Sequence, residues 1–507
     1  MHTEKRRRLI MRKRRILTVL LALTVIFTMS FAAIPVYAVS GTAITSADDL
    51  KAMENNPSGS YYLANDIEVP ANLSLFTDSR NPFTGTFDGN GHMIKNYTYN
   101  TAKEDLMHAG LFCRTRNAAF KNLTMTNVNI FVKSGGNFAA LAAYGQGTVF
   151  ENITVSGKVS ASGAINSLGG IVGSLNGGSI TKCTNKADVT VTGSINAAAA
   201  GVAGKAGANS ILKNCSNSGK VSISGPIEGG RDFRAAGVTN VAGTVISCKN
   251  TGDVSVKTGG STETAANLSA AGVVGTSNKQ IASCTNTGRI TMNSTVEVSR
   301  SILMGGAAAN AENAKITKSW NKGAVTFSGV AQYGAVIGGL SAVTSNISQS
   351  WNKGAVNAKA TKNKMDVVAG GLAGTAVDMR NSYNAGSVTI NGKGYVGGLA
   401  GNAGIFDHRI INNYSTGTIK GSKGATKGQL LGIYSAGDDK ASNKIYNNYY
   451  TKSGKGYGFG SAAKKSWTAK SHKVASITAK NCPKLSSKYW TYSGKYKRLI
   501  LKNNKEK

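Results

Sequence analysis

One repeat of the chain reads Gly272-Val273-Val274-Gly275 and, a few residues later, Ile281-Ala282-Ser283-Cys284-Thr285-Asn286-Thr287-Gly288-Arg289-Ile290. Similar copies follow one another at intervals of about 31 to 36 residues along most of the chain. A period of this length is typical of solenoids, propellers and arrays, in which one unit stacks on the next. The repeat therefore predicts one elongated body and not several separate globular domains.

An apolar residue stands three positions before Cys284 and its equivalents in about twelve copies. This column consists of Ile94, Phe120, Phe150, Ile180, Leu212, Val245, Ile281, Ile316, Ile347, Met379, Ile410 and Ile445. A second apolar column stands six positions after the cysteine, and both must face a common interior because apolar side chains gain stability by leaving water. The segments are short, are broken by Gly, Asn and Ser, and have no helical stripe, which predicts an all-β parallel β-helix of about twelve turns.

The two ends of such a solenoid need caps, because they otherwise expose core and unpaired strand edges. Ser46-Ala47-Asp48-Asp49 is a capping box that predicts a short helix over residues 46–55. We therefore divide the chain into an N-terminal cap and first turn at 39–96, parallel β-helix repeats at 97–457, and a basic C-terminal cap and tail at 458–507 that closes the far end.

The first residues predict export. A run of Lys and Arg residues precedes an apolar stretch from Ile16 to Val36, which ends in the cleavage-like tripeptide Val36-Tyr37-Ala38. We expect a signal peptide at residues 1–38, with an uncleaved membrane anchor as the alternative. After cleavage we expect no membrane segment and a secreted, extracellular protein associated with the cell surface.

The phrases at Gly371 to Gly374 and Gly398 to Gly401, together with the opening segment 83–92, resemble the GLUG-motif repeats of secreted bacterial proteins. The resemblance covers roughly residues 43 to 502. It implies a right-handed, extracellular β-helix of the adhesin-like kind. It implies no settled catalytic activity and brings no catalytic residues with it.

The position after the cysteine column changes from Thr, Ser and Lys to aromatic residues beyond Thr285. The aromatic residues are Trp320, Trp351, Tyr383, Tyr414 and Tyr449. If they face outward they form an apolar stripe on which sugar rings can lie, and if they face inward they belong to the core. We take them as candidate glycan-binding residues and leave the two orientations open.

Three further columns have structural explanations. Four of the six cysteines share one position, and we favour a stacked row of reduced, buried thiols over disulfides between turns. An asparagine column, which includes Asn286, suits left-handed turn conformations and hydrogen bonds from turn to turn. The glycine two residues later suits the same turns.

The chain carries a net charge of +35, from 59 Lys and Arg against 24 Asp and Glu. Such a charge favours polyanions, and in an exported protein the expected partner is an anionic cell-envelope polymer or a host glycan and not nucleic acid. A solvated, solubilising surface is the alternative. The candidate anion-binding lysines lie in the loops that close the later turns: Lys359, Lys362, Lys364, Lys393, Lys420, Lys423 and Lys427.

Evidence for catalysis is weak. The best acidic cluster would be Glu228, Glu263 and Glu297, with Arg231 and Arg300 nearby, but solvated loop acids explain these residues more simply. The histidines show no metal-ligand spacing, and we expect neither a metal nor a cofactor. The predicted function is a non-catalytic, surface-associated binding protein; a polysaccharide lyase or hydrolase on the same scaffold and a passive spacer are the alternatives.

Overall fold

The computed structural model describes residues 40–101, 106–193, 196–226, 232–260, 266–295, 301–331, 333–361, 365–403, 409–434, 444–451, 458–462 and 470–506. The described residues from 41 onward belong to one compact unit. The predicted signal peptide, residues 1–38, lies outside the described residues. Among the described residues, no helix is long and apolar enough to cross a membrane.

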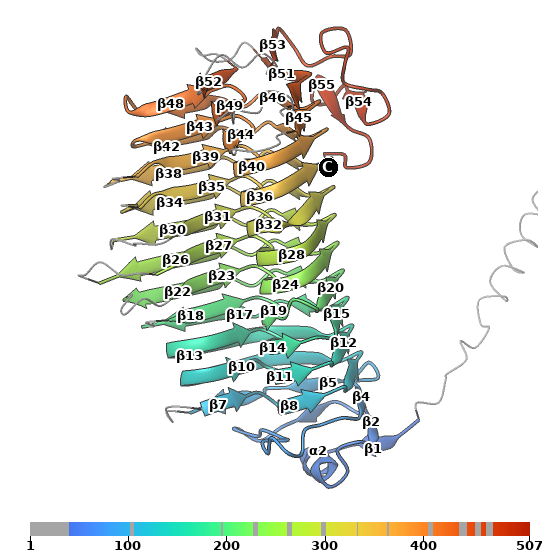
Figure 1. Cartoon of the computed structure of the whole chain (residues 1–507). Helices are drawn as coiled ribbons and strands as arrows, with labels where there is room; N and C mark the ends of the chain where they lie inside the picture. The colour runs from blue at the N-terminus through green and yellow to red at the C-terminus, as the bar shows by residue number, and fades with distance from the viewer. Residues whose placement is uncertain are drawn as a thin grey trace, which may run out of the picture. The chain divides into compact units, whose positions relative to one another are not determined.

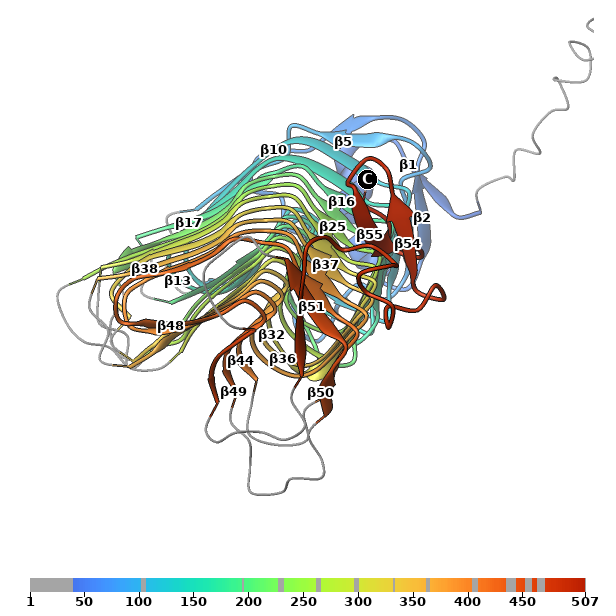
Figure 2. The ribbon, with the colours of Figure 1, turned by 90° about the horizontal axis from the view of Figure 1, so that it is seen from above.

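Each turn of the chain forms short strands that lie beside the equivalent strands of the turns before and after it. In one central turn these are β28 (Val274–Ala282), β29 (Thr285–Asn286), β30 (Ile290–Ser294) and β31 (Ile302–Gly305). The pairing is parallel, as between β28 and β24 (Thr239–Ile246) of the preceding turn. The stacked layers are seen from the side in Figure 1 and from the end in Figure 2. The prediction of an all-β parallel β-solenoid is confirmed, with about eleven turns where the repeat predicts about twelve.

A short helix begins the solenoid, as the capping box predicts. α2 (Ala47–Ala52) continues into the 3-10 helix η2 (Met53–Asn55). The N–H of Asp49 donates to Oγ of Ser46 at 3.1 Å, and the N–H of Ser46 donates to the carboxylate of Asp49 at 3.0 Å. Leu50 is fully buried in the main core, so this helix supplies apolar cover at the N-terminal end of the stack (Figure 1).

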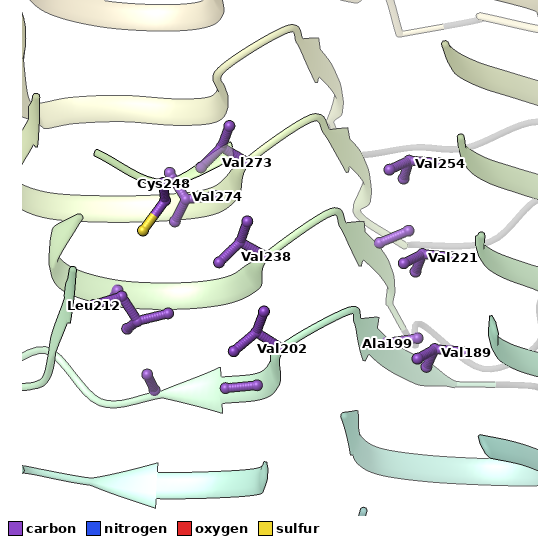
Figure 3. Packing of buried hydrophobic residues seen from close by; sticks show 14 of the residues in the cluster. Val189, Ala199, Val202, Leu212, Val221, Val238, Cys248, Val254, Val273 and Val274 are labelled. Carbon is purple, nitrogen blue, oxygen red and sulfur yellow. The ribbon is translucent and has the colours of Figure 1, made fainter. Parts of the chain in front are cut away.

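The apolar columns line one continuous interior. Every residue of the column three positions before the cysteines is buried, with at most 1% of its surface exposed. Figure 3 shows part of a second column, Val189, Val221 and Val254, across the interior from Val202 and Val238. β-Branched side chains suit this arrangement because they pack well on a pleated surface. Each turn is therefore held by burial against the turns above and below it.

The turn before each cysteine-equivalent residue uses a left-handed backbone conformation. Ser283 has φ of 54° and Gln349 has φ of 47°. The residues with this conformation at this position are Asn96, Asn122, Asn152, Lys182, Asn214, Ser247, Ser283, Lys318, Gln349, Asn381, Asn412 and Asn447. The expectation that the column containing Asn286 occupies such turns is therefore wrong: the left-handed residue lies three positions earlier, and Asn286 itself belongs to strand β29.

The asparagine column forms a buried ladder along the solenoid. Nδ2 of Asn286 donates to Oδ1 of Asn321 in the next turn at 2.7 Å and to the carbonyl of Gly288 at 2.8 Å. The same bond joins each neighbouring pair from Asn185 to Asn384 over 2.7 to 2.9 Å. Because both amide hydrogens have acceptors, these polar side chains can lie in the interior without an unmet hydrogen bond.

The Gly-apolar-apolar-Gly phrase makes room for this ladder. A Cβ atom on Gly272 would lie 2.1 Å from the carbonyl oxygen of Gly306 and 2.4 Å from Cγ of Asn286. A Cβ atom on Gly275 would lie 2.6 Å from the carbonyl oxygen of Asn240. The two glycines therefore allow close approach of backbone and amide groups, and the phrase has a structural cause.

The cysteine row consists of free, buried thiols, as are all six cysteines of the chain. Sγ of Cys215 donates to the carbonyl of Ile180 at 3.2 Å. Burial raises the pKa of the Cys183 and Cys248 thiols, so both stay protonated at neutral pH. The structure has the reduced row and not a chain of disulfides.

Candidate functional site

The aromatic residues that follow the cysteine column form a ladder of stacked rings. Ring centroids lie 5.1 Å apart for Trp320 and Trp351, 6.0 Å for Trp351 and Tyr383, and 4.8 Å for Tyr383 and Tyr414, with planes 9° to 10° apart. The rings belong to an apolar cluster separate from the main core. They therefore face away from the solenoid interior, which answers the orientation question that the sequence leaves open.

The C-terminal segment, residues 477–506, covers this ladder. It contains the antiparallel pair β54 (Trp490–Ser493) and β55 (Arg498–Leu501), which Figures 1 and 2 show beside the stack. Trp351, Tyr383 and Tyr414 are fully buried, whereas Trp320 at the edge is half-buried. The segment contributes Ile477, Cys482, Leu485, Trp490, Leu499 and Leu501 to the same cluster. The ladder is therefore not an exposed stripe in this structure, and glycan binding by it stays a prediction that requires the segment to move.

Polar groups of the ladder also have partners in the C-terminal segment. Nε1 of Trp351 donates to the carbonyl of Asn504 at 2.9 Å, and the hydroxyl of Tyr414 donates to the carbonyl of Leu499 at 2.6 Å. Burial raises the pKa of Tyr414 well above its ordinary value, so its hydroxyl stays a donor. At the end of the column, the hydroxyl of Tyr449 accepts from the N–H of Lys484 at 3.4 Å.

Glu506 is the charged centre of this contact. Its side chain is fully buried, and its Oε1 accepts from the hydroxyl of Tyr383 at 2.7 Å and from Nη2 of Arg498 at 2.6 Å. Nζ of Lys353 lies 3.0 Å from Oε2. Burial favours the neutral acid, but hydrogen bonds from Tyr383 and Lys353 and the charge of Arg498 outweigh it and hold the pKa of Glu506 below its ordinary value. The segment is thus attached by ion pairs as well as by apolar contact.

The sequence places the C-terminal cap at the open end of the solenoid, and the structure places most of it along the flank. β53 (Ser471–Val474) does extend the stack, because it pairs with β51 (Asn448–Thr451). Asn504, however, donates to the carbonyls of Ser319 and Gln349, several turns earlier in the chain. Residues 463–469 of the predicted cap and tail lie outside the described residues.

The candidate anion-binding lysines are partly described. Lys359 on β38 (Val356–Ala360), Lys420 on β47 (Ile419–Gly421) and Lys427 on β48 (Ala425–Gly428) are exposed. Lys423 and Lys393 are exposed as well, and Nζ of Lys393 lies 3.8 Å from the carboxylate of Asp366. Lys362 and Lys364 lie outside the described residues. The described lysines gather on neighbouring strands and loops of the later turns, where they are open to solvent.

The acidic candidates Glu228, Glu263 and Glu297 lie outside the described residues, as do Arg231 and Arg300. In the part of the chain that the structure describes, no group of three or more His, Cys, Asp and Glu side chains is placed to hold a metal ion.

Two hollows of the surface were not predicted from the sequence. A shallow depression of about 430 Å³ lies at a break in strand register and is lined by groups that include Asn96, Asn127 and Lys158. A smaller pocket of about 130 Å³ is lined by groups that include Lys205, Asp232 and Arg234. Lys205 pairs in register with Ser174 of the preceding turn. In the sequence this pocket is marked by no more than a lysine, Lys205, aligned with a small residue, Ser174, of the preceding repeat.

Comparison with known proteins connects the N-terminal part of the chain with one family. Residues 39–157 match the model of the M26 IgA1-specific metallo-endopeptidase N-terminal region. The expected resemblance to GLUG-motif repeats is corrected by this match, because the family found is a different one.

Individual relatives are similar over limited parts. Halomucin of Haloquadratum walsbyi is 30% identical over 147 residues, which make up 26% of this chain and 2% of halomucin. A solved IgA1 protease aligns with 63% of this chain and 21% of its own at 16% identity and a TM-score of 0.35. A candidate immunoglobulin A1 protease from Bacteroides ovatus aligns with 54% of this chain and 84% of its own at 18% identity and a TM-score of 0.36. The chain thus spans a small fraction of halomucin and about a fifth of the IgA1 protease.

Proposed function

We propose that this chain is an extracellular, non-catalytic scaffold that binds anionic cell-envelope polymers or acidic glycans through exposed lysines of its later turns. The observation that carries the proposal is the excess of basic side chains, a net charge of +35 that is still +28 without residues 1–38, together with the exposure of Lys359, Lys420, Lys423 and Lys427. A surface of one charge sign attracts polyanions and raises their local concentration.

The solenoid suits such a ligand. Parallel strands of neighbouring turns lie about 4.8 Å apart. Lys359 on β38 and Lys420 on β47 belong to one column of strands, two turns apart, so positive charges recur along the same flank. A polymer with repeated negative charges can contact several such side chains at once, and many weak contacts then combine into useful affinity. Exposed ion pairs contribute little individually and are screened by salt, so the binding should depend strongly on ionic strength.

The test is binding of the mature chain, residues 39–507, to purified envelope polymer at low and high salt. We expect at least a tenfold loss of affinity between about 50 mM and 500 mM NaCl, since screening grows over this range. Replacing Lys359, Lys420, Lys423 and Lys427 by Gln should weaken binding in the same way. Binding that is equal at both salt concentrations would contradict the proposal.

A control variant separates location from total charge. Lys186, Lys213, Lys220 and Lys249 are exposed lysines of earlier turns of the solenoid, and their replacement by Gln changes the net charge by the same amount. We expect this variant to keep most of the affinity. If it loses as much as the first variant, the binding follows overall charge, and the lysines of the later turns have no special role. Depolymerisation of the polymer during the assay would favour the alternative of a polysaccharide-cleaving enzyme.

The family match favours a second candidate function. Because residues 39–157 match the N-terminal region of an IgA1-specific metallo-endopeptidase, this part of the chain is a candidate for contact with IgA1. The test is surface plasmon resonance of the mature chain on immobilised IgA1, with IgG as the control. Equal binding, or none, on the two immunoglobulins would remove this candidate.

A further inference from the structure

The pocket at Lys205 lies where two columns of strands meet. β18 (Ala197–Ala200) and β23 (Phe233–Ala236) pair with each other on one side, and β19 (Ala203–Ala206) carries Lys205 on the other. Figure 2 shows these columns from the end through two of their later members, β48 and β49, which run at an angle to each other. The pocket is about 130 Å³ in volume, enough for a few small groups.

Asp232 and Arg234 form an ion pair with each other at the edge of the pocket. Oδ2 of Asp232 accepts from Nη2 of Arg234, and Oδ1 accepts from the backbone N–H and from Nδ2 of Asn267 at 2.9 and 3.0 Å. The backbone N–H of Asp232 donates to Oδ1 of Asn196 at 3.1 Å, which fixes the position of the carboxylate. Both carboxylate oxygens are therefore in use, and the aspartate has little capacity left for another cation.

Lys205 has no such partner. It is half-buried, and it forms no hydrogen bond or ion pair with any residue that the structure describes. Burial, and then the positive charge of Arg234, lower the pKa of Lys205, and the negative charge of Asp232, which is already paired with Arg234, offsets them only in part. An ammonium group carries three donors, and removing it from water without a counter-ion costs free energy. A ligand that brings a negative charge to Nζ would recover this cost.

We propose that this pocket binds the carboxylate group of an acidic sugar, with the ammonium of Lys205 as its counter-charge. A monoanion fits best, because one uncompensated cation faces a small pocket and a dianion would leave a negative charge in it without a partner. Asn166, Asn196 and Ala198 line the same pocket. Amides bind sugar hydroxyls and a small apolar surface accepts the C–H face of a ring, a combination typical of small-molecule sites.

The inference deepens the proposed function, because it names one site and one anion class, yet the two can fail separately. The exposed lysines of the later turns are proposed to bind a polymer through many salt-sensitive contacts. The pocket is proposed to bind a single sugar residue. A protein that keeps its polymer binding after replacement of the four exposed lysines and still binds a monosaccharide would contradict only the location of the polymer site. A protein that loses polymer binding in that variant but never binds a monosaccharide would contradict only the pocket.

The test uses D-glucuronate as the probe and saturation-transfer NMR on the mature chain. We expect weak binding of glucuronate, at least tenfold weaker binding of neutral D-glucose and of glucuronate methyl ester, and loss of glucuronate binding in Lys205→Met. Lys213→Met, which removes an exposed lysine of β20 (Ile211–Lys213), should bind like the unaltered chain. Equal binding of glucose and glucuronate, equal binding by the two variants, or equally strong competition by inorganic sulfate would each overturn the proposal.

A second measurement does not depend on the folding of a variant. The lysines of the unaltered chain are labelled by reductive ¹³C-methylation, and the titration of the Lys205 signal is followed with and without glucuronate. Bound carboxylate favours the charged ammonium, so the titration should move to higher pH with glucuronate and stay in place with glucose. A Lys205 titration that glucuronate leaves unchanged would also overturn the proposal.

Discussion

Replacement of Glu506 by Gln tests how the C-terminal segment is attached. Gln has nearly the same shape as Glu and keeps one oxygen that can accept from the hydroxyl of Tyr383. It removes the negative charge that lies 2.6 Å from Nη2 of Arg498 and 3.0 Å from Nζ of Lys353. The variant therefore changes charge and leaves the packing of the aromatic ladder in place.

The expected cost follows from burial. The side chain of Glu506 is fully buried, and that of Arg498 is 17% exposed. Removing one partner of a buried ion pair costs about 3–5 kcal/mol, because the other charge is left uncompensated. Since Gln keeps an acceptor and Lys353 is less buried, we expect a loss near the lower limit, about 3 kcal/mol, in the free energy that holds the segment on the solenoid.

Amide hydrogen exchange measures this free energy locally. A loss of about 3 kcal/mol raises the opening equilibrium constant about 150-fold, so amides of β54 and β55 should exchange faster by that factor. Amides of the central turns, such as those of β28, should be unaffected. Glu312→Gln is the control, because Glu312 is exposed on β32 (Ala308–Thr317). An increase below threefold in β54 and β55, or an equal increase in the control, would refute the role given to Glu506.

Acid should release the segment through the same residue. The pKa of Glu506 is held below its ordinary value in the folded chain, so its stabilising effect is complete above the ordinary glutamate pKa near 4.5 and is lost as pH falls through the lower folded value. We expect tryptophan fluorescence to report exposure of Trp490 and Trp351 on acidification below about pH 4.5. Glu506→Gln should lose this dependence on pH, because its side chain does not titrate, and an identical pH dependence in both proteins would speak against this assignment.

Three further predictions concern the solenoid. Asn286→Ala should lower the free energy of unfolding by about 2–4 kcal/mol, because it leaves partners in both neighbouring turns without a bond, whereas exposed Asn293→Ala should change it little; urea denaturation compares them. Gly339→Ala places a Cβ atom 2.0 Å from the carbonyl of Gly371 and should destabilise by at least about 3 kcal/mol, whereas Gly494→Ala meets nothing within 4 Å and should be neutral in the same assay. The thiols should react with a thiol reagent only on unfolding, and reductant should leave the melting temperature unchanged; fast reaction of Cys248 in the native chain would contradict its burial.

The solenoid could be predicted from the sequence because each turn contacts mainly its neighbours. A residue such as Ile281 meets Val245 and Ile316 in register, so the same side-chain preference returns at every turn and becomes visible as a column. The asparagine ladder and the glycine phrase are visible for the same reason. The left-handed position was missed although seven of its twelve residues are Asn, because Ser247, Ser283, Lys318 and Gln349 replace Asn in consecutive central turns and interrupt the column there.

The pocket and the C-terminal segment were not predictable in this way. The pocket depends on the relative placement of Lys205 in one turn and of Asp232 and Arg234 in the next. None of these three residues belongs to a column of similar residues, so the repeat does not reveal them. The contacts of Asn504 with Ser319 and Gln349 join parts of the chain more than 150 residues apart and occur once. A periodic pattern carries no information on such a contact.

The C-terminal segment nevertheless explains why the position after the cysteine column changes from polar to aromatic residues along the repeat. At the position after the cysteine column, Ser216 and Lys249 of the earlier turns are half-buried or exposed, whereas Trp351, Tyr383 and Tyr414 are fully buried. These buried rings contact residues 477–506, so the aromatic side chains occur where the solenoid flank is covered and polar ones where it is open to water. The change from polar to aromatic therefore has a structural cause that needs no sugar ligand. Binding is better sought on the surfaces that the segment leaves free, the exposed lysines of the later turns and the pocket at Lys205.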